Sequence, residues 1–380
     1  MSLKAYKFRI YPTKAQETVL EQTLETCRRI YNRTLALRKD EYEATKTSIS
    51  LFETNKQLTQ WKKQNPFYLS KVHSQVLQNV QVRVDLAFQG FFRRVKIDPT
   101  NAGYPRFKGR GRYNSITYPQ PGTAFRLRSG YIELSKIGKV KVKQHRAVEG
   151  NPKTCTVSKT CTGKWFISLA CEQEPKQKSE REFKAVGIDL GVRTLCTLSN
   201  GDEVQPPRFL MQDEPILKKA QQKLSAAEKG SKLRKKCKKV VAHIHERIAN
   251  KRKDFCDKLS LSLVQTYSFI AFEELEIDEM VQRSDCYIEK HILDAAWNQL
   301  VSKTQCKAED AGTTVILVNP RNTTKMCSQC GTLVPKDRNE TVHDCPACGL
   351  SLGRDHNAAI NILRLGLQSV GSIPRCPSLQ

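Results

Sequence analysis

The chain lacks the long hydrophobic runs that insertion into a membrane requires. None of its apolar stretches approaches the roughly 18 residues of a membrane span. Its first residues, MSLKAYKFRIYP, alternate charged and apolar side chains and contain no apolar core of signal-peptide length. We therefore expect a protein of an intracellular, reducing compartment that has no membrane partner.

Acidic residues are scarce as well. The chain has 38 Asp and Glu residues against 64 Lys and Arg residues, which gives a formal net charge of +26 at pH 7. The excess extends along the chain and is densest at residues 93–112, 135–146 and 218–253. This distribution indicates a polyanionic partner, because each neutralised phosphate releases condensed counterions. The alternative is a basic surface that contacts only solvent.

The 14 cysteines do not indicate a disulfide framework, because the chain is long and no secretion signal is evident. Most are isolated and are predicted to act as small apolar residues. Four form two Cys-x-x-Cys pairs separated by fourteen residues: Cys327, Cys330, Cys345 and Cys348. A glycine, Gly331 or Gly349, follows each pair, so each turn can aim two thiolates at one ion. The spacing predicts one structural Zn²⁺, with an iron–sulfur cluster as the alternative.

The N-terminal half combines strand and helix periodicity. Residues 4–12 alternate apolar and basic side chains, as a half-buried strand does, and Thr13 is a candidate N-cap for the helix that follows. A second helix is expected from about Leu69 to Lys96, and residues 115–173 return to a period of two. This order predicts a β-barrel or sheet that begins at residue 4, is interrupted by a helical insertion and resumes near residue 115.

A charged linker, residues 174–182, precedes a second half of alternating strands and helices. The expected elements are, in order, a strand around AVGIDLG, basic helices from Pro215 to Thr266, a buried strand at 269–277, a helix from Leu293 to Ala311, the strand TTVILVNP and a final helix after the cysteine pairs. Such alternation predicts an α/β core.

Three carboxylates interrupt apolar segments of this second half. Asp189 lies within GIDLG, Glu273 follows SFIAF, and Asp355 opens RDHNAAINI at the start of a helix. Taken singly, Asp189 could be neutralised by a buried arginine, Glu273 could be an exposed strand end and Asp355 could be a helix cap. If the three converge, their repulsion requires divalent cations. Two Mg²⁺ ions about 3.5–4 Å apart would clamp the attacking and leaving oxygens of a phosphodiester.

Several short motifs occur in a fixed order along the chain: GIDLGV, FEEL, two CxxCG pairs and RDxNAAxNI. In this order they resemble the TnpB (OrfB) family of transposon-encoded RNA-guided nucleases, which are smaller relatives of type V CRISPR effectors. The segments KFRIYPTKAQ, AFQGFFRR, GYPRFKGRGR and HIHERIANKRKDF extend the resemblance over most of the chain.

The resemblance implies a multidomain α+β fold. It assigns residues 1–12 and 113–175 to an OB-like wedge β-barrel and residues 13–112 to a helical recognition insertion. It assigns residues 183–321 and 351–370 to an α/β RNase H-like (RuvC) nuclease domain, residues 322–350 to an inserted zinc ribbon that binds target nucleic acid, and residues 371–380 to a flexible tail.

The resemblance also implies the site residues and cofactors. The catalytic triad falls on Asp189, Glu273 and Asp355, which would hold two catalytic Mg²⁺ ions, while the cysteine quartet would hold one structural Zn²⁺. Glu274 competes with Glu273 for the second catalytic position. Gly353 is a departure, since the family often has an acid two residues before the last catalytic one.

The implied partners are a guide RNA derived from the transposon end and double-stranded target DNA, with one protein copy expected per RNA. The expected location is the prokaryotic cytoplasm, in association with the nucleoid. Gln78 and Asn79 lie near the family's reader of a short duplex motif, and amides can pair bidentately with adenine; ordinary polar helix positions are the alternative. Charged and aromatic side chains in the following loop suit RNA backbone or unpaired bases, with a solvated loop as the alternative: Arg106, Phe107, Lys108, Arg110 and Arg112.

These inferences predict an RNA-guided DNA endonuclease of a transposable element. It would hydrolyse target DNA by a two-metal mechanism after guide pairing next to a short flanking motif. One alternative is a nuclease-silent RNA-guided DNA-binding regulator, which the intact acids disfavour. The other is an RNase H-like transposase, which the cysteine ribbon and the N-terminal barrel disfavour.

Overall fold

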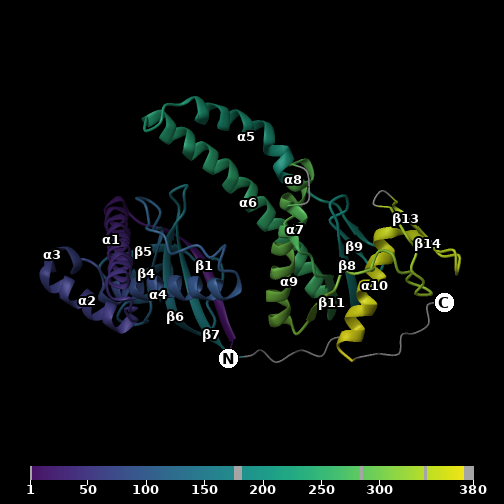
Figure 1. The fold of residues 1–380 in the computed structure, drawn as a ribbon, viewed down its shortest axis with the longest axis horizontal. Helices are drawn as coiled ribbons and strands as arrows, with labels where there is room; N and C mark the ends of the chain where they lie inside the picture. Colours follow the sequence, from purple (N-terminus) through teal and green to yellow (C-terminus); the bar gives the residue numbers. More distant parts are fainter. Residues whose placement is uncertain (1, 175–181, 283–285, 338–339, 372–380) are drawn as a thin grey trace. The chain divides into compact units, whose positions relative to one another are not determined.

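The chain divides into two compact units, Met1–Pro175 and Lys176–Gln380 (Figure 1). A computed structural model describes residues 2–174, 182–282, 286–337 and 340–371. The predicted linker and the predicted tail lie almost wholly outside the described residues. Within those residues, no helix has the length and apolar character needed to cross a bilayer.

The first unit contains a barrel-like sheet and helices packed against it. The helices are α1 (Lys14–Thr45), α2 (Leu51–Gln64), α3 (Pro66–Leu69) and α4 (Ser74–Ile97). The strands are β1 (Ser2–Tyr11), β2 (Ser115–Tyr118), β3 (Phe125–Arg128), β4 (Tyr131–Leu134), β5 (Gly138–Lys143), β6 (Asn151–Lys159) and β7 (Trp165–Gln173). They lie in the order β2-β6-β7-β1-β5-β4-β3, so the N-terminal strand pairs with strands from after the helices, antiparallel to both β7 and β5.

The predicted start of the first helix is confirmed. The Thr13 side chain accepts a hydrogen bond from the Gln16 amide, and the Gln16 side chain accepts one from the Thr13 amide, which completes a capping box. The predicted start of the second helix at Leu69 is wrong. Residues 66–69 form the separate turn α3, and α4 begins only after His73, which has extended backbone angles.

The core of this unit follows from the alternation of β1. Tyr6, Phe8 and Ile10 point inward and are almost completely buried, together with Leu20 and Cys27 of α1. The basic residues between them lie on the other face of the strand. Because this face of β1 and the apolar face of α1 are buried in the same core, the first helix is tied to the sheet.

The second unit is built on a smaller mixed sheet. Its strands are β8 (Ala185–Leu190), β9 (Cys196–Leu198), β10 (Glu203–Val204), β11 (Phe269–Glu273) and β12 (Thr314–Val318), in the order β10-β9-β8-β11-β12. β8, β9 and β10 pair antiparallel, whereas β11 runs parallel to both β8 and β12. The helices are α5 (Phe209–Ala226), α6 (Lys232–Thr266), α7 (Ile277–Gln282), α8 (Cys286–Ala295), α9 (Trp297–Ala311) and α10 (Arg354–Ser369).

Three predicted boundaries in this unit are wrong. The basic helices predicted from Pro215 begin six residues earlier, at Phe209, and α5 contains that proline. The buried strand predicted at 269–277 ends at Glu273, where its pairing with β12 stops. The helix predicted from Leu293 to Ala311 is interrupted, because Ala296 adopts a left-handed conformation (φ 56°) between α8 and α9. Sequence periodicity does not register a single residue of this kind, since the apolar pattern continues across it.

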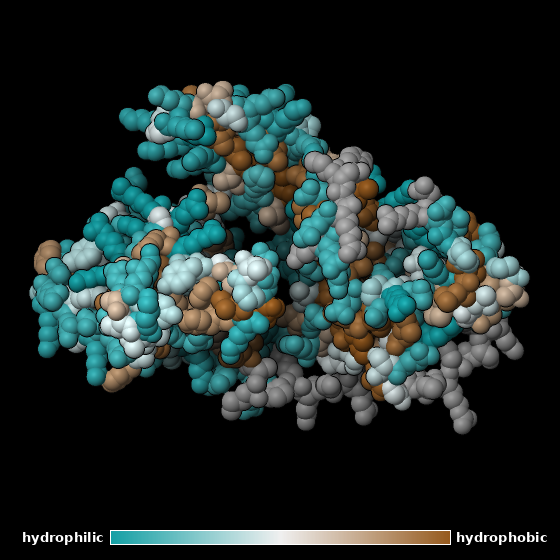
Figure 2. All heavy atoms as spheres, in the orientation of Figure 1, coloured by the Kyte–Doolittle hydropathy of each residue, from teal (hydrophilic) through white to brown (hydrophobic). Residues whose placement is uncertain are grey.

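Helices α5 and α6 form a long basic hairpin (Figure 1). Hydrophilic side chains cover most of it on the face drawn in Figure 2. Asp213 of α5 is 3% exposed and accepts hydrogen bonds from Arg247 (2.8 Å) and Lys251 (3.0 Å) of α6. A buried carboxylate needs such partners, so these two bonds fix the register of the hairpin.

Candidate active site and four-cysteine metal centre

The three predicted acids lie on elements that pack together. Asp189 is the penultimate residue of β8, and Glu273 is the last residue of β11. The two strands are parallel neighbours, and the pairing of Phe272 with Ile188 puts Glu273 next to Asp189 at the same sheet edge. Asp355 lies in the first turn of α10, which packs against both strands.

The glycine before Asp189 allows this packing. A Cβ atom at Gly187 would lie 2.2 Å from the carbonyl oxygen of Ala359 and 2.5 Å from the amide nitrogen of Leu363, both in α10. Gly366 likewise allows close packing further along α10, because a Cβ atom at this position would lie 2.7 Å from the Cβ atom of Ala271 in β11. The backbone of α10 therefore lies directly on β8 and β11, which brings the helix start to the sheet edge.

The electrostatics of Asp189 reflect this convergence. Burial, together with the negative charges of Glu273 and Asp355, raises the pKa of its carboxyl to about 8, although the positive charge of Arg354 opposes the rise. Arg354 also forms an ion pair with Asp355, 3.1 Å from Nε to Oδ1. A carboxyl perturbed by burial and by two neighbouring acids is typical of a functional site.

Glu273 differs from its neighbour Glu274. Burial raises the pKa of Glu273, and a hydrogen bond from the Thr323 hydroxyl (3.1 Å to Oε1) opposes the rise. Glu274 is exposed, and its amide bonds to the carbonyl of Val318 as the strand ends. The negative charge of Glu273 raises the pKa of Asp189. The geometry thus favours Glu273 as the second acid of the site.

A cleft of about 660 Å³ opens beside these acids. Asp189 and Asp355 line it, whereas Glu273 is not among its lining residues. Its other charged lining residues are mostly basic: Arg193, Lys325, Lys336, Asp337 and Arg354. A cleft that is lined by two of these acids and by several cations can hold a phosphodiester backbone beside a metal site.

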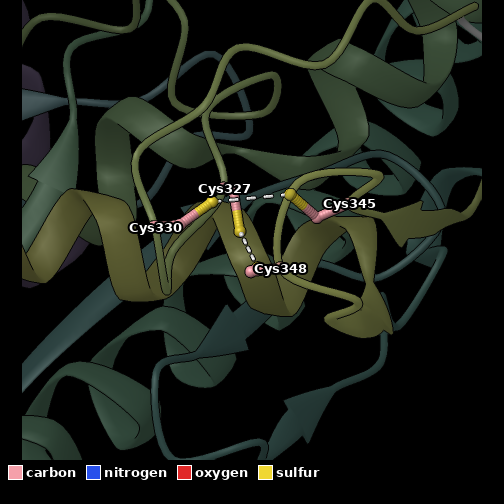
Figure 3. A group of neighbouring side chains, drawn as sticks. All are labelled: Cys327, Cys330, Cys345 and Cys348. Atoms are coloured by element: carbon pink, nitrogen blue, oxygen red, sulfur yellow. Dashed lines mark hydrogen bonds between the residues drawn. The ribbon is translucent and has the colours of Figure 1, made fainter.

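The four cysteines converge as their spacing predicts (Figure 3). All four sulfur atoms lie within 4.8 Å of one another, with Cys327 Sγ 3.6 Å from Cys348 Sγ and Cys330 Sγ 3.5 Å from Cys345 Sγ. In a tetrahedral site with Zn–S bonds of about 2.3 Å, the sulfurs are about 3.8 Å apart. The arrangement therefore fits one tetrahedral metal ion bound by thiolates alone.

The two cysteine pairs have matching backbone turns. The amide of Gly331 donates to the carbonyl of Cys327 (3.0 Å), and the amide of Gly349 donates to the carbonyl of Cys345 (2.9 Å). Both glycines have positive φ values, 79° and 75°, which other residues rarely adopt. β13 (Val342–Asp344) precedes the second pair and β14 (Ser351–Gly353) follows it, and the two strands form an antiparallel ribbon.

Among the described residues, the cysteine quartet is the one group of three or more His, Cys, Asp or Glu side chains whose ligand atoms are close enough to hold a metal ion. Asp189, Glu273 and Asp355 do not form such a group, although the charges of Glu273 and Asp355 act on Asp189. The cysteine site is thus arranged for an ion, while the acids lie near one another without a closed ligand shell.

Two asparagines of α10 were not predicted as site residues. Asn357 and Asn361 have no exposed surface, and both bind backbone groups of the chain that enters the first cysteine pair. A spacing of four residues puts them on one face of the helix. The run NAAIN carried this signal, because asparagine is rarely buried without a specific hydrogen-bonding partner.

Gly353, the departure from the family pattern, is the N-cap residue of α10, and no side chain caps that helix. An acidic side chain at this position would accept hydrogen bonds from the first amides of the helix. The glycine therefore removes a local helix cap.

The structure separates the two predicted duplex-reading amides. Gln78 is exposed on α4, whereas Asn79 Oδ1 accepts a hydrogen bond from Arg83 Nε (3.1 Å). Arg83 also donates to the Ser115 carbonyl (2.7 Å) and the Thr117 hydroxyl (2.8 Å), so it connects α4 to β2. Gln78 remains available to a ligand, while Asn79 helps to orient Arg83.

The loop after α4 is anchored at one residue and exposed around it. The Lys108 amide donates to Asn32 Oδ1 (2.8 Å), and its carbonyl accepts from Asn32 (3.0 Å) and Arg28 (2.9 Å). The other predicted nucleic-acid contacts of this loop are exposed: Arg106, Phe107, Arg110 and Arg112. Phe107 is 54% exposed, although it is a large apolar side chain.

Comparison with solved structures defines the fold class. The chain superposes on Cas12f1 from a cryo-EM structure of a Cas12f1–sgRNA–target DNA complex with a TM-score of 0.58 at 13% identity, covering 95% of this chain and 98% of that one. At this identity the match concerns the fold alone. The protein is thus a mixed α+β chain of the Cas12f-like fold class, with a barrel-like sheet and a four-cysteine site.

Comparison with curated sequences defines the family. The chain is 34% identical over 373 residues to a Streptomyces pristinaespiralis protein named "Putative RNA-guided DNA endonuclease", covering 96% of this chain and 89% of that protein. It is 30% identical over 379 residues to an Escherichia coli K12 protein named "Putative RNA-guided DNA endonuclease InsQ", covering 96% of this chain and 92% of that protein. The chain belongs to the TnpB (OrfB) family, as the motif order predicts.

Family models match three segments of the chain. A model described as "Probable transposase" matches residues 168–284, and one described as "Cas12f1-like, TNB domain" matches residues 297–362. A third, described as "Helix-turn-helix domain", matches residues 1–47. In this structure that last segment forms β1 and the single uninterrupted helix α1.

Proposed function

We propose that this protein is an RNA-guided DNA endonuclease. The observation that carries the proposal is the convergence of Asp189, Glu273 and Asp355 at one sheet edge. They lie in a chain whose relatives, along nearly its whole length, are named RNA-guided DNA endonucleases. A nuclease-silent regulator would have no need of three acids that disfavour one another.

The finer fold assignment is part of the proposal. The second unit would be an RNase H-like (RuvC) domain, which is supported by three antiparallel strands extended by two parallel ones with α10 on one face. The first unit would be an OB-like wedge barrel with the helical recognition insertion α1–α4 between its first two strands. The residues around the cysteine pairs would be the zinc ribbon.

The acids would serve as metal ligands. Asp189, Glu273 and Asp355 would hold two Mg²⁺ ions, which when bound polarise the scissile phosphate and activate water. Burial raises the pKa of Asp189 and of Glu273, and two neighbouring acids add to the rise at Asp189, so bound cations would stabilise the ionised carboxylates. Arg354, already paired with Asp355, would orient that carboxylate and balance charge in the cleft.

The partners would be a guide RNA and double-stranded target DNA. A groove of about 1320 Å³ beside β5 offers cationic and stacking groups in the first unit: Tyr11, Arg128, Lys141, Lys143, His145 and Arg146. The exposed loop around Phe107 and the basic hairpin α5–α6 add further cationic surface. Such surfaces bind phosphate backbones with little sequence preference, which leaves recognition to base pairing.

The decisive experiment is plasmid cleavage by protein that has been stripped of copurifying RNA. Cleavage in Mg²⁺ is expected only when a matching guide is added, and Asp189→Ala is expected to abolish it while guide and target binding persist. Equal, sequence-blind cleavage with and without the guide would favour an unguided nuclease or a transposase. Guide-dependent binding without cleavage by the unaltered protein would favour the regulator.

A further inference from the structure

The chain between β12 and the first cysteine pair contacts both candidate metal sites. We define residues 323–328 as the linking segment. Its first residue, Thr323, is 1% exposed, and its hydroxyl lies 3.1 Å from Glu273 Oε1 and 3.0 Å from the Pro320 carbonyl. Its fifth residue is Cys327, whose sulfur belongs to the four-cysteine site. One short segment therefore touches an acid at one end and a thiolate site at the other.

Helix α10 holds this segment through its two buried asparagines. Asn357 Nδ2 donates to the Met326 carbonyl (2.8 Å), while its Oδ1 accepts from the Ser328 amide (2.8 Å). Asn361 Nδ2 donates to the carbonyls of Thr323 (2.9 Å) and Met326 (2.7 Å). These bonds fix the backbone on both sides of Cys327 against the helix, since buried amides left without partners are costly.

The same helix carries Asp355, two residues before Asn357. A shift of Cys327 would move Met326 and Ser328, and through them the start of α10. A shift of Thr323 would remove the hydrogen bond to Glu273. Because both connections are short and at least partly buried, small movements at the cysteines would reach the acids.

We propose that the linking segment couples occupancy of the four-cysteine site to the geometry of the acids, with Thr323 positioning Glu273 and Asn357 positioning Asp355. The proposal rests on the function proposed above, since it assigns these residues to the same nuclease site. The metal at the cysteines would then organise catalysis as well as stabilise the ribbon. Neither residue touches the reacting atoms, so both are positioning residues.

The first test concerns Thr323. Thr323→Val removes the hydroxyl with little change of shape, Thr323→Ser restores a hydroxyl, and Thr314→Val on the exposed surface of β12 is a matched control. Single-turnover cleavage is measured against Mg²⁺ concentration with saturating guide and target. The concentration for half-maximal cleavage is expected to rise about tenfold in Thr323→Val, and to stay near that of the unaltered protein in the other two variants. An unchanged Mg²⁺ dependence in Thr323→Val overturns the role of Thr323.

The second test needs no nucleic acid. Mn²⁺ binding to the acids is followed by electron paramagnetic resonance, with zinc present and after zinc has been stripped and the chelator dialysed away. Zinc removal is expected to weaken Mn²⁺ binding about tenfold. In Asn357→Asp, which keeps the acceptor for Ser328 but loses the donor to Met326, binding with zinc present should resemble that of the stripped protein.

The two tests separate failure of the inference from failure of the proposed function. If the unaltered protein shows no guide-dependent cleavage, the proposed function fails, while the Mn²⁺ measurement still reports on the coupling. If Mn²⁺ binding is the same with and without zinc, the coupling is overturned, whatever the cleavage assay shows. Release of zinc to a chromogenic chelator, faster in Asn357→Asp than in Thr314→Val, would support the coupling from the cysteine side.

Discussion

The four-cysteine site and the three-acid site both gather groups that repel one another when ionised, but they are assembled differently. The cysteine site comes from one short stretch, in which two glycine turns with positive φ aim two thiolates each. The acid site takes one residue each from β8, β11 and α10, which are far apart in the sequence. The first is fixed by local backbone geometry, and the second is fixed by packing.

This difference in assembly explains why the ligand atoms of the cysteine site are arranged for a metal ion, whereas those of the acid site are not. The cysteine sulfurs already lie at separations suited to a tetrahedral ion. The separation of the acids is set by the packing of the sheet and α10. Burial and the charges of the two other acids raise the pKa of Asp189. At the cysteines, the arrangement that binds a metal ion also stabilises the fold. At the acids, the burial of neighbouring carboxylates that the proposed function needs lowers stability.

The largest expected effect comes from removing a cysteine ligand. The binding free energy of a structural Zn²⁺ is on the order of 10 kcal/mol and acts as local folding energy. Cys330→Ser is expected to abolish zinc binding and to unfold residues 325–350, measured by elemental analysis and limited proteolysis. Unaltered protein should contain about one zinc per chain.

The matched control is Cys306→Ser, which changes an exposed cysteine of α9. It should retain zinc and resist proteolysis as the unaltered protein does. A Cys330→Ser variant that keeps the ribbon folded would break the comparison, because the local turns would then suffice without metal.

The next largest effect concerns the acids, where two adjacent glutamates provide the comparison. Glu273→Gln is expected to reduce the single-turnover cleavage rate on the order of 10³-fold, or about 4 kcal/mol, because it removes a charged metal ligand. Glu274→Gln, at the exposed neighbouring position, should change the rate only a few-fold. Guide and target binding should persist in both variants. The reverse order of effects would reassign the second acid to Glu274.

A third prediction separates packing from local geometry. Gly187→Ala puts a methyl group 2.2 Å from a carbonyl oxygen of α10, and this backbone contact cannot relax without moving the helix. The free energy of unfolding should fall by about 3 kcal/mol, and cleavage should fall with it, whereas zinc content should stay near one per chain. Gly90→Ala in α4, which meets only a flexible arginine end at 3.5 Å, should be neutral or slightly stabilising. The coupling through the linking segment is expected to speed zinc release in this variant without emptying the site, because a tight site stays filled after a moderate loss of affinity. Complete loss of zinc would show that the cysteine turns themselves depend on α10 packing.

Features that depend on local backbone geometry could be predicted from the sequence, whereas features that depend on packing between distant segments were harder to predict. The cysteine spacing and its glycines define a local geometry, so the convergence of four thiols could be predicted residue by residue. Thr13 as a helix cap and the buried face of β1 were predictable for the same reason, because caps and alternation are local signals. Convergence of the acids, in contrast, required the motif order as well as their apolar surroundings.

The remaining features depend on contacts that no local pattern encodes. In the sequence, Asn357 is one polar residue of the motif at the start of the last helix. Its role in binding the backbone of the first cysteine turn is evident only from the hydrogen bond that it accepts from the Ser328 amide. Asn79 has the chemistry to read a base, yet Arg83 engages it within the first unit. The break at Ala296 left no periodic signal, since a single left-handed residue changes direction without changing hydropathy.

The smallest expected effect concerns the metal-free protein. Burial and two neighbouring acids raise the pKa of folded Asp189 to about 8, against 3.8 for its ordinary value. Between these pH values the folded state holds a proton that the unfolded state has lost, so stability falls as pH rises from about 4 to about 8 and is level above that. Asp189→Asn removes this dependence.

In a chelator buffer that leaves zinc in place, Asp189→Asn should therefore raise the free energy of unfolding, measured by thermal unfolding, relative to the unaltered protein. The difference in this free energy should be near zero at pH 4 and should grow to on the order of 1–2 kcal/mol at pH 8, because relaxation and water limit the cost of a buried charge. Asp254→Asn, which alters an exposed carboxylate of α6, should show no growing difference. Adding Mg²⁺ should reduce the difference in the free energy of unfolding by stabilising the protein that retains Asp189. If this difference is constant from pH 4 to pH 8, Asp189 is not held among acids, and the two sites do not differ in their electrostatics as argued above.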